Sequence, residues 1–299
     1  MSIFAISLVV FSALLHAGWN VLGKSSSGSG YSFALGASFT PFLLLSPYLY
    51  WCFTVVGYTN VGIDFWWLLL LSCLGQAIYL VCVIKAYQQG DVGMMYPIIR
   101  ALPVLMVGLG TVFIGQVLTA NAWVGFLILT LGCLLVPLRR VSEIRLKAYA
   151  NIGVLWAFVA ALGTTVYSIV DNEALHWLQH QTSGLTDKHI AIFYLGLQFL
   201  GTSTVIFIWL LISGNKHELN QATKYWKRSS IAGIMMGLTY GIVLYSMTLV
   251  ENVSYIVALR QVSIVFGLFL GIWLLNEKWY LVRGLGVMLV LVGLIVALI

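Results

Sequence analysis

Long apolar runs recur through this chain and constrain its fold more than any other feature. A bilayer core of about 30 Å requires roughly 20 apolar residues in a helix, and ten runs approach that length. The runs are apolar at successive positions rather than alternating, which favours helices over the strands of a membrane barrel. We therefore predict an all-α integral membrane protein with ten transmembrane helices. The predicted spans are 3–22, 33–53, 65–84, 94–114, 122–138, 152–170, 190–212, 231–249, 253–275 and 281–299.

The few charged residues set the expected environment and orientation. They make up 8% of the 299 residues, whereas soluble domains contain about 25%. Most of the 15 Lys and Arg residues fall in odd-numbered connections or at their edges, so the positive-inside rule makes those connections cytoplasmic and both termini external. The net charge of +6 is too scattered to indicate a nucleic-acid partner. The four cysteines lie in apolar runs without metal-ligand spacing, so we expect no metal and no cofactor.

The two halves of the chain resemble each other. Trp19 in the first span corresponds to Tyr167 in the sixth, and Arg100 in the fourth corresponds to Arg260 in the ninth. Each half contains five spans, an odd number, so the second copy is expected to be inverted, as in many alternating-access transporters. The predicted units are a five-helix repeat over 1–138, a basic connecting loop over 139–150, and a second five-helix repeat over 151–299.

Several short motifs carry a family resemblance over nearly the whole chain. The motifs are residues 15–20, 96–100 with 115–116, 165–171, and 258–260 with 275–277. In their order and duplication they resemble the EamA-type, ten-helix members of the drug/metabolite transporter superfamily. The resemblance implies a cavity walled by spans 1, 3, 4, 6, 8 and 9, with spans 5 and 10 peripheral. It also implies a multi-pass protein of a bacterial-type inner (plasma) membrane that moves small organic solutes, often outward.

Two arginines lie inside apolar runs. A charge in hydrocarbon costs at least about 2.5–3.5 kcal/mol, so such residues usually face a protein interior or a cavity. Arg100 and Arg260 are expected either to meet an anionic group of a substrate, or to cap carbonyls and pair with acids such as Asp171 and Glu251 in gating or ion-pairing roles. The inverted repeat places the arginines on opposite sides of the centre, about 10 Å apart in depth.

Other polar and aromatic residues within the spans are candidates for the cavity wall. His16 either carries a coupling proton near its usual pKa of about 6.5 or is a neutral hydrogen-bonding residue between helices. An aromatic cavity can hold a quaternary ammonium or a flat ring, and aromatic side chains can also merely fill space. With the two arginines, the candidate substrate-binding residues are His16, Trp19, Asn20, Gln76, Tyr79, Tyr167 and Tyr240.

Together these features favour a secondary transporter of a small polar or zwitterionic, amino-acid-like metabolite, acting as an exporter. An importer of a choline-like cation is the alternative within the same class. The sequence shows no nucleotide-binding loop, zinc motif or nucleophile elbow, so an intramembrane enzyme and a non-transporting scaffold or receptor rank lower. The expected partners are a small-molecule substrate and the lipid bilayer, and the expected state is a monomer or homodimer.

Overall fold

The computed structural model describes residues 1–23, 30–57, 61–89, 92–140, 151–182, 184–275 and 278–299. The described residues form helices and their connections, without a strand, which confirms the all-α prediction. Residues 141–150 of the predicted connecting loop lie outside the described part of the chain. The helices are α1 (Ile3–Gly23), α2 (Gly30–Val56), α3 (Ile63–Gln89), α4 (Val92–Phe113), α5 (Ala120–Leu135), α6 (Ile152–Gln181), α7 (Asp187–Ile212), α8 (Lys216–Lys224), α9 (Trp226–Met247), α10 (Val253–Leu259), α11 (Val262–Leu275) and α12 (Leu281–Leu298).

Most of these helices are apolar enough to lie in a bilayer. Among the described residues, seven segments are long and apolar enough to cross it: α2, α3, α6, α7, α9, α12, and α10 together with most of α11. Shorter apolar stretches occupy Ile3–Ala17, Ile98–Phe113 and Ala120–Leu135, where the first, fourth and fifth spans were predicted. The chain is therefore an all-α, multi-pass membrane protein, and the number of ten spans stays a prediction.

The structure departs from the predicted spans in three places. Helix α6 continues eleven residues beyond the predicted end at Val170, to Gln181. The apolar pattern stops there because the polar residues that follow, including Asp171, are buried inside the protein rather than exposed to lipid. A short amphipathic helix, α8, fills a connection for which no helix was predicted. The predicted ninth span is interrupted at Arg260 and Gln261, between α10 and α11.

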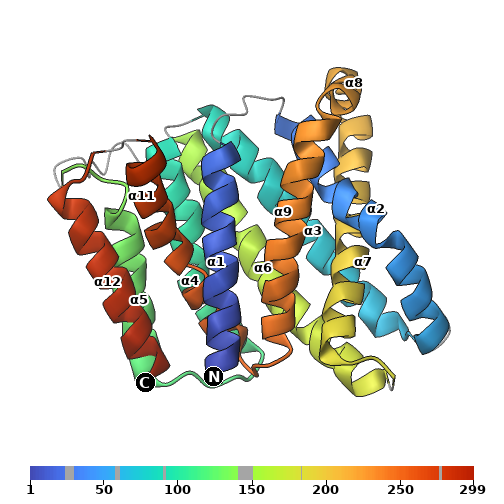
Figure 1. Cartoon of the computed structure of the whole chain (residues 1–299), viewed down its shortest axis with the longest axis horizontal. Coiled ribbons are helices and arrows are strands. Elements are labelled where there is room, and N and C mark those ends of the chain that lie inside the picture. Colours follow the sequence, from blue (N-terminus) through green and yellow to red (C-terminus); the bar gives the residue numbers. More distant parts are fainter. Residues whose placement is uncertain (24–29, 58–60, 90–91, 141–150, 183, 276–277) are drawn as a thin grey trace.

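The helices pack into a broad bundle in which distant parts of the chain lie side by side (Figure 1). Helix α3 packs along α6, and α1 packs on α9. Helix α4 packs on α6, α1 on α11, α2 on both α7 and α9, and α3 on α7. Helices α5 and α12 pair at one edge of the bundle. Both termini lie on one face, and α8 lies at the opposite face (Figure 1).

The α5–α12 pair is held together by glycines at its contact surface. A methyl carbon added at Gly132 of α5 would lie 2.6 Å from the backbone nitrogen of Val290 in α12. A methyl carbon at Gly293 of α12 would lie 2.5 Å from the backbone nitrogen of Leu129. Backbone atoms cannot move aside as a flexible side chain can. The two helices therefore approach at a distance that only glycine permits, as is common in membrane bundles.

Substituting Gly132 with valine is expected to separate α5 from α12. Overpacking of a tight core typically costs about 1–3 kcal/mol, which corresponds to a fall in melting temperature of roughly 2–5 °C for a chain of this size. The measurement is thermal unfolding of the purified protein in detergent. Gly267→Val in α11 is the matched control, because a methyl carbon there meets no described atom within 4 Å. Equal melting temperatures for the two variants would contradict this account of the glycine contact.

Candidate functional site

A cavity of about 320 Å³ lies within the helix bundle. Residues of α1, α2, α3, α4, α6, α7 and α9 line it, together with Arg260 between α10 and α11. The family resemblance implied walls from six of these regions, and the structure adds α2 and α7. None of the described lining residues comes from α5 or α12. The cavity extends toward the face where α2 begins and α3 ends, since Gly30, Phe33 and Tyr87 are part of its wall.

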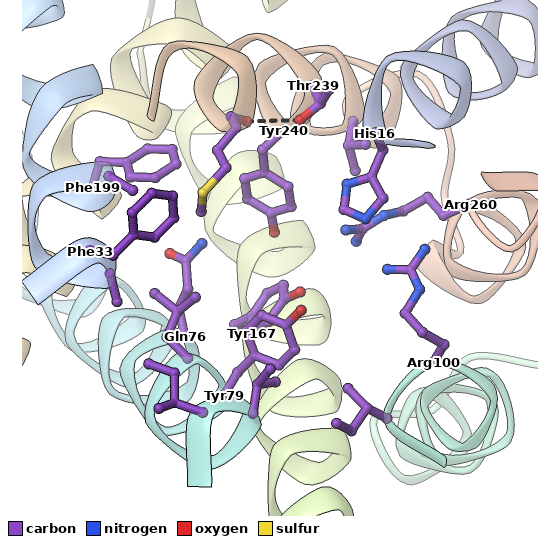
Figure 2. Close-up of a pocket in the computed structure, with 18 of the residues that line it drawn as sticks. His16, Phe33, Gln76, Tyr79, Arg100, Tyr167, Phe199, Thr239, Tyr240 and Arg260 are labelled. Atoms are coloured by element: carbon purple, nitrogen blue, oxygen red, sulfur yellow. Dashed lines mark hydrogen bonds between the residues drawn. The ribbon is translucent and has the colours of Figure 1, made fainter. Parts of the chain in front are cut away.

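Both arginines lie at the same end of this cavity. Figure 2 shows the side chains of Arg100, Arg260 and His16 grouped together on one side of the space. The prediction that the arginines stand on opposite sides of the centre is therefore wrong. Arg100 lies eight residues inside α4, about 12 Å from its start at 1.5 Å per residue, and so is deeper than the predicted span implied. Long flexible stems then bring both guanidinium groups to one place.

Local structure holds each arginine in position. Arg260 lies at the break between α10 and α11, where its backbone N–H donates to the Ile256 carbonyl at 3.0 Å. Ser263, one turn later, donates its backbone N–H to the Arg260 carbonyl at 3.1 Å. The Ser263 hydroxyl accepts a hydrogen bond from Arg100 Nη2 at 2.7 Å. This bond ties the Arg100 guanidinium of α4 to the region beside Arg260.

Three tyrosines form an aromatic wall beside the arginines. The ring centroids of Tyr79 and Tyr167 are 5.9 Å apart, as are those of Tyr167 and Tyr240, and both pairs are edge-to-face. The Arg260 guanidinium carbon lies 5.4 Å from the centroid of the Tyr240 ring, within the range of a cation–π contact. The hydroxyls of Tyr79 and Tyr167 point into the space that the arginines face (Figure 2). These rings connect the basic end of the cavity to its remaining wall.

The end of the cavity away from the arginines is mostly apolar. Phe33 of α2 and Phe199 of α7 lie there beside Gln76 of α3 (Figure 2). The Gln76 side-chain oxygen accepts a hydrogen bond from the Thr202 hydroxyl at 2.9 Å, which fixes the orientation of its amide. The cavity thus has a basic end, a tyrosine wall and a phenylalanine-rich end.

Asp171 is fully buried behind this wall rather than at the end of a span. Its carboxylate accepts hydrogen bonds from the hydroxyls of Ser72 and Tyr240, from Tyr194 at 2.7 Å, and from Gln198 at 2.8 and 2.9 Å. These donors come from α3, α7 and α9, so Asp171 joins three helices to α6. The expected pairing of Asp171 with Arg260 is therefore not what the structure shows, because Tyr240 contacts both residues and stands between them.

The remaining predicted residues fall into two groups. Trp19 and Asn20 lie in α1, but their side chains are outside the described part of the structure. Glu251 is exposed in the connection between α9 and α10, where it pairs with no described basic residue and lines no part of the cavity. Within the described chain, no cluster of three His, Cys, Asp or Glu residues could hold a metal ion.

Sequence reasoning missed several residues of the site. Ser12, Phe33, Phe199 and Thr239 line the cavity, and the Ser12 hydroxyl joins α1 to α9 by donating to the Thr239 carbonyl at 2.7 Å. Phenylalanine and serine within an apolar run resemble any other membrane residue. Only the positions of α1, α2, α7 and α9 in the bundle identify these residues as part of the wall.

A multi-pass helical bundle that encloses a basic and aromatic cavity has the features of a membrane protein that handles a small solute. The sequence model of the EamA-like transporter family matches residues 3–138. The match confirms the predicted resemblance to this family and indicates a membrane transporter of the drug/metabolite transporter type.

The fold also occurs among solved structures. One crystal structure of a protein aligns over 98% of this chain and 96% of its own, with a TM-score of 0.67 and 14% sequence identity. At that identity the similarity establishes the fold alone. Comparison with curated proteins gives no match.

Proposed function

We propose that this protein is a secondary transporter that exports a small polar or zwitterionic, amino-acid-like metabolite by alternating access. The observation that carries the proposal is the cavity of about 320 Å³, which presents Arg100 and Arg260 beside three tyrosines inside a membrane bundle. Charged side chains at membrane depth mark solute pathways when they face a cavity. The substrate is expected to bind through an anionic group at the arginines.

The proposed architecture is ten spans arranged as two inverted five-helix repeats, over 1–138 and 151–299. The helix contacts support it. The proposed repeat pairs α1 with α6, α2 with α7, α3 with α9, α4 with α10–α11, and α5 with α12. Under this pairing the contact between α3 and α6 corresponds to the contact between α9 and α1. The contact between α4 and α6 corresponds to the contact between α11 and α1. Likewise α2–α9 corresponds to α7–α3, while α2–α7 and α5–α12 correspond to themselves. A two-fold relation between the halves produces this pattern, and the site then lies at the repeat interface.

The proposed location is a bacterial-type inner membrane, with the protein a monomer or homodimer. The exposed residues Lys216, Lys224, Lys227 and Arg228 lie in or beside α8, at the face toward which the cavity extends. By the positive-inside rule that face is cytoplasmic. In this orientation the cavity receives a substrate from the cytoplasm, which is the loading step of an exporter.

In this proposal the hydrogen bonds of Asp171 close the cavity on the side away from the cytoplasm. These bonds hold α3, α6, α7 and α9 together, and Asp171 lies in the second half of α6, toward Gln181. Tyr240 lines the cavity and also donates to Asp171, so a bound substrate that moves this ring acts on the closure directly. Opening these contacts while the α2–α9 side closes over the substrate completes one transport cycle.

A choline-like cation is the second candidate substrate. The observation that favours it is the tyrosine wall, because tyrosine faces attract quaternary ammonium groups. In that case the protein is an importer and the arginines are structural. An intramembrane enzyme is a weaker alternative, since the family match is to transporters.

Counterflow in proteoliposomes tests the proposed function. Vesicles containing the full-length protein are loaded with one unlabelled solute from a panel of amino acids, nucleobases, organic acids, polyamines and choline, and the same solute is supplied outside in radiolabelled form. We expect transient accumulation of label for at least one anion-bearing solute, and none in protein-free vesicles. Accumulation of choline alone would favour the importer. Turnover of a solute by the protein in detergent, without two compartments, would replace transport with catalysis.

A further inference from the structure

We infer that the substrate is an organic anion that carries an aromatic ring, with its carboxylate at Arg100 and Arg260 and its ring against the tyrosine wall. The inference rests on the proposed transport function and narrows its substrate class. It also predicts an anion rather than a zwitterion, because the proposed contacts require no positive group on the substrate.

The charges around the cavity select an anion. Among its described lining residues there are two arginines and no aspartate or glutamate. Asp171, which contacts the wall residue Tyr240, has no exposed surface, and its oxygens already accept hydrogen bonds from four side chains. A cationic ligand would therefore meet two positive charges, and no described lining residue offers it a countercharge. A carboxylate would meet two opposite charges, and hydrogen bonds between arginine and a carboxylate are among the strong ones.

The two arginines are oriented before a ligand binds. Ser263 holds one end of the Arg100 guanidinium, and the Arg260 guanidinium carbon lies over the Tyr240 ring, 5.4 Å from its centroid. A guanidinium carries its N–H donors in a planar fork that can form paired hydrogen bonds to a carboxylate. Arg100 Nε is buried without a hydrogen-bond partner among the described protein atoms, so this guanidinium is not saturated by the protein.

The remaining wall fits an aromatic ring. The Tyr167 ring is edge-to-face with both Tyr79 and Tyr240, and Phe33 and Phe199 lie further from the arginines (Figure 2). Aromatic groups prefer offset-stacked and edge-to-face contacts of this kind. The volume of about 320 Å³ lies near the lower end of the roughly 300–1,000 Å³ typical of small-molecule pockets. It suits one or two fused rings with a short acidic side chain.

Four compounds that share parts of one structure separate the contributions of charge and ring. Indole-3-acetate carries the ring and the carboxylate, tryptophan adds an ammonium, tryptamine keeps the ammonium without the carboxylate, and acetate lacks the ring. Binding to the purified full-length protein is measured by thermal shift, since a ligand of the folded state raises the melting temperature, and by calorimetry. We expect indole-3-acetate to bind at least about tenfold more tightly than tryptamine or acetate.

Two variants assign the binding to this cavity. Arg260→Gln is expected to reduce indole-3-acetate binding by at least about tenfold, whereas Arg228→Gln, at the exposed start of α9, is expected to leave it unchanged. Thermal unfolding without ligand shows whether each variant is folded. Tryptamine binding as tightly as indole-3-acetate would overturn the assignment of charge, and equal binding of acetate would overturn the assignment of the ring. Absence of binding by all four compounds would overturn the inference, while counterflow of another solute would leave the transport function standing.

Discussion

Replacing both Arg100 and Arg260 with glutamine is expected to abolish transport and to weaken substrate binding by more than about 100-fold. A hydrogen bond to a charged group contributes about 1.5–3 kcal/mol, and each 1.4 kcal/mol is a tenfold change in affinity. The two side chains meet at one end of a single cavity, so their losses are expected to combine on one substrate group. Each single variant is expected to lose about 10- to 100-fold. The measurements are counterflow in proteoliposomes and calorimetric binding of the transported solute.

The control separates binding from folding. Arg228→Gln removes an exposed arginine outside the cavity and is expected to retain normal transport. Glutamine keeps hydrogen-bonding capacity toward Ser263, so the Arg100 variant is expected to unfold within a few degrees of the unmodified protein. A folded double variant that still transports with unchanged affinity would show that the arginines do not contact the substrate.

Replacing Asp171 with alanine is expected to produce the largest loss of stability of any single substitution considered. The change leaves Ser72, Tyr194, Gln198 and Tyr240 without the acceptor that they share in a fully buried site. Each buried donor left without an acceptor costs about 1–3 kcal/mol, so a total loss of about 4 kcal/mol or more is expected, which corresponds to roughly 6 °C or more in melting temperature for a chain of this size. The measurement is thermal unfolding of the purified protein in detergent, accompanied by counterflow at a temperature where the variant is folded.

Two further variants make this test specific. Asp64→Asn removes an exposed acid at the start of α3 and is expected to leave the melting temperature within about 1 °C. Tyr194→Phe removes one of the donors to Asp171 and is expected to cost about 1–2 kcal/mol. An Asp171→Ala protein as stable as the Asp64→Asn protein would contradict the role of Asp171 in joining the four helices.

The fold could be predicted from the sequence wherever the residues that face lipid and the residues that face the protein interior are both apolar. Runs such as the one that forms α7 are apolar on all sides, so hydropathy alone located them. The prediction failed at the end of α6 because Asp171 and Asn172 are polar and yet buried. Asp171 is held by residues of α3, α7 and α9 that are up to about a hundred positions away in the chain, and no local pattern contains that information.

The site could be predicted in part for the same reason. Arg100, Arg260 and His16 stand out because ionisable residues are rare in membrane helices, and all three line the cavity. The predicted difference in depth between Arg100 and Arg260 was wrong because neither the helix break at Arg260 nor the length of the two side chains can be read from the spacing of the spans. Phe33 and Phe199 were missed because an aromatic residue in a membrane helix has no local feature that separates a cavity wall from a lipid contact.

An experimental structure with a bound ligand tests the central claim most directly. The ligand is whichever solute gives counterflow and the largest thermal shift. We expect its density in the cavity of about 320 Å³, with an acidic group within hydrogen-bond distance of Arg100 and Arg260 and the rest of the molecule against Tyr79, Tyr167 and Tyr240. Density in the separate apolar groove between α2, α7 and α9, with the arginines unliganded, would contradict the account.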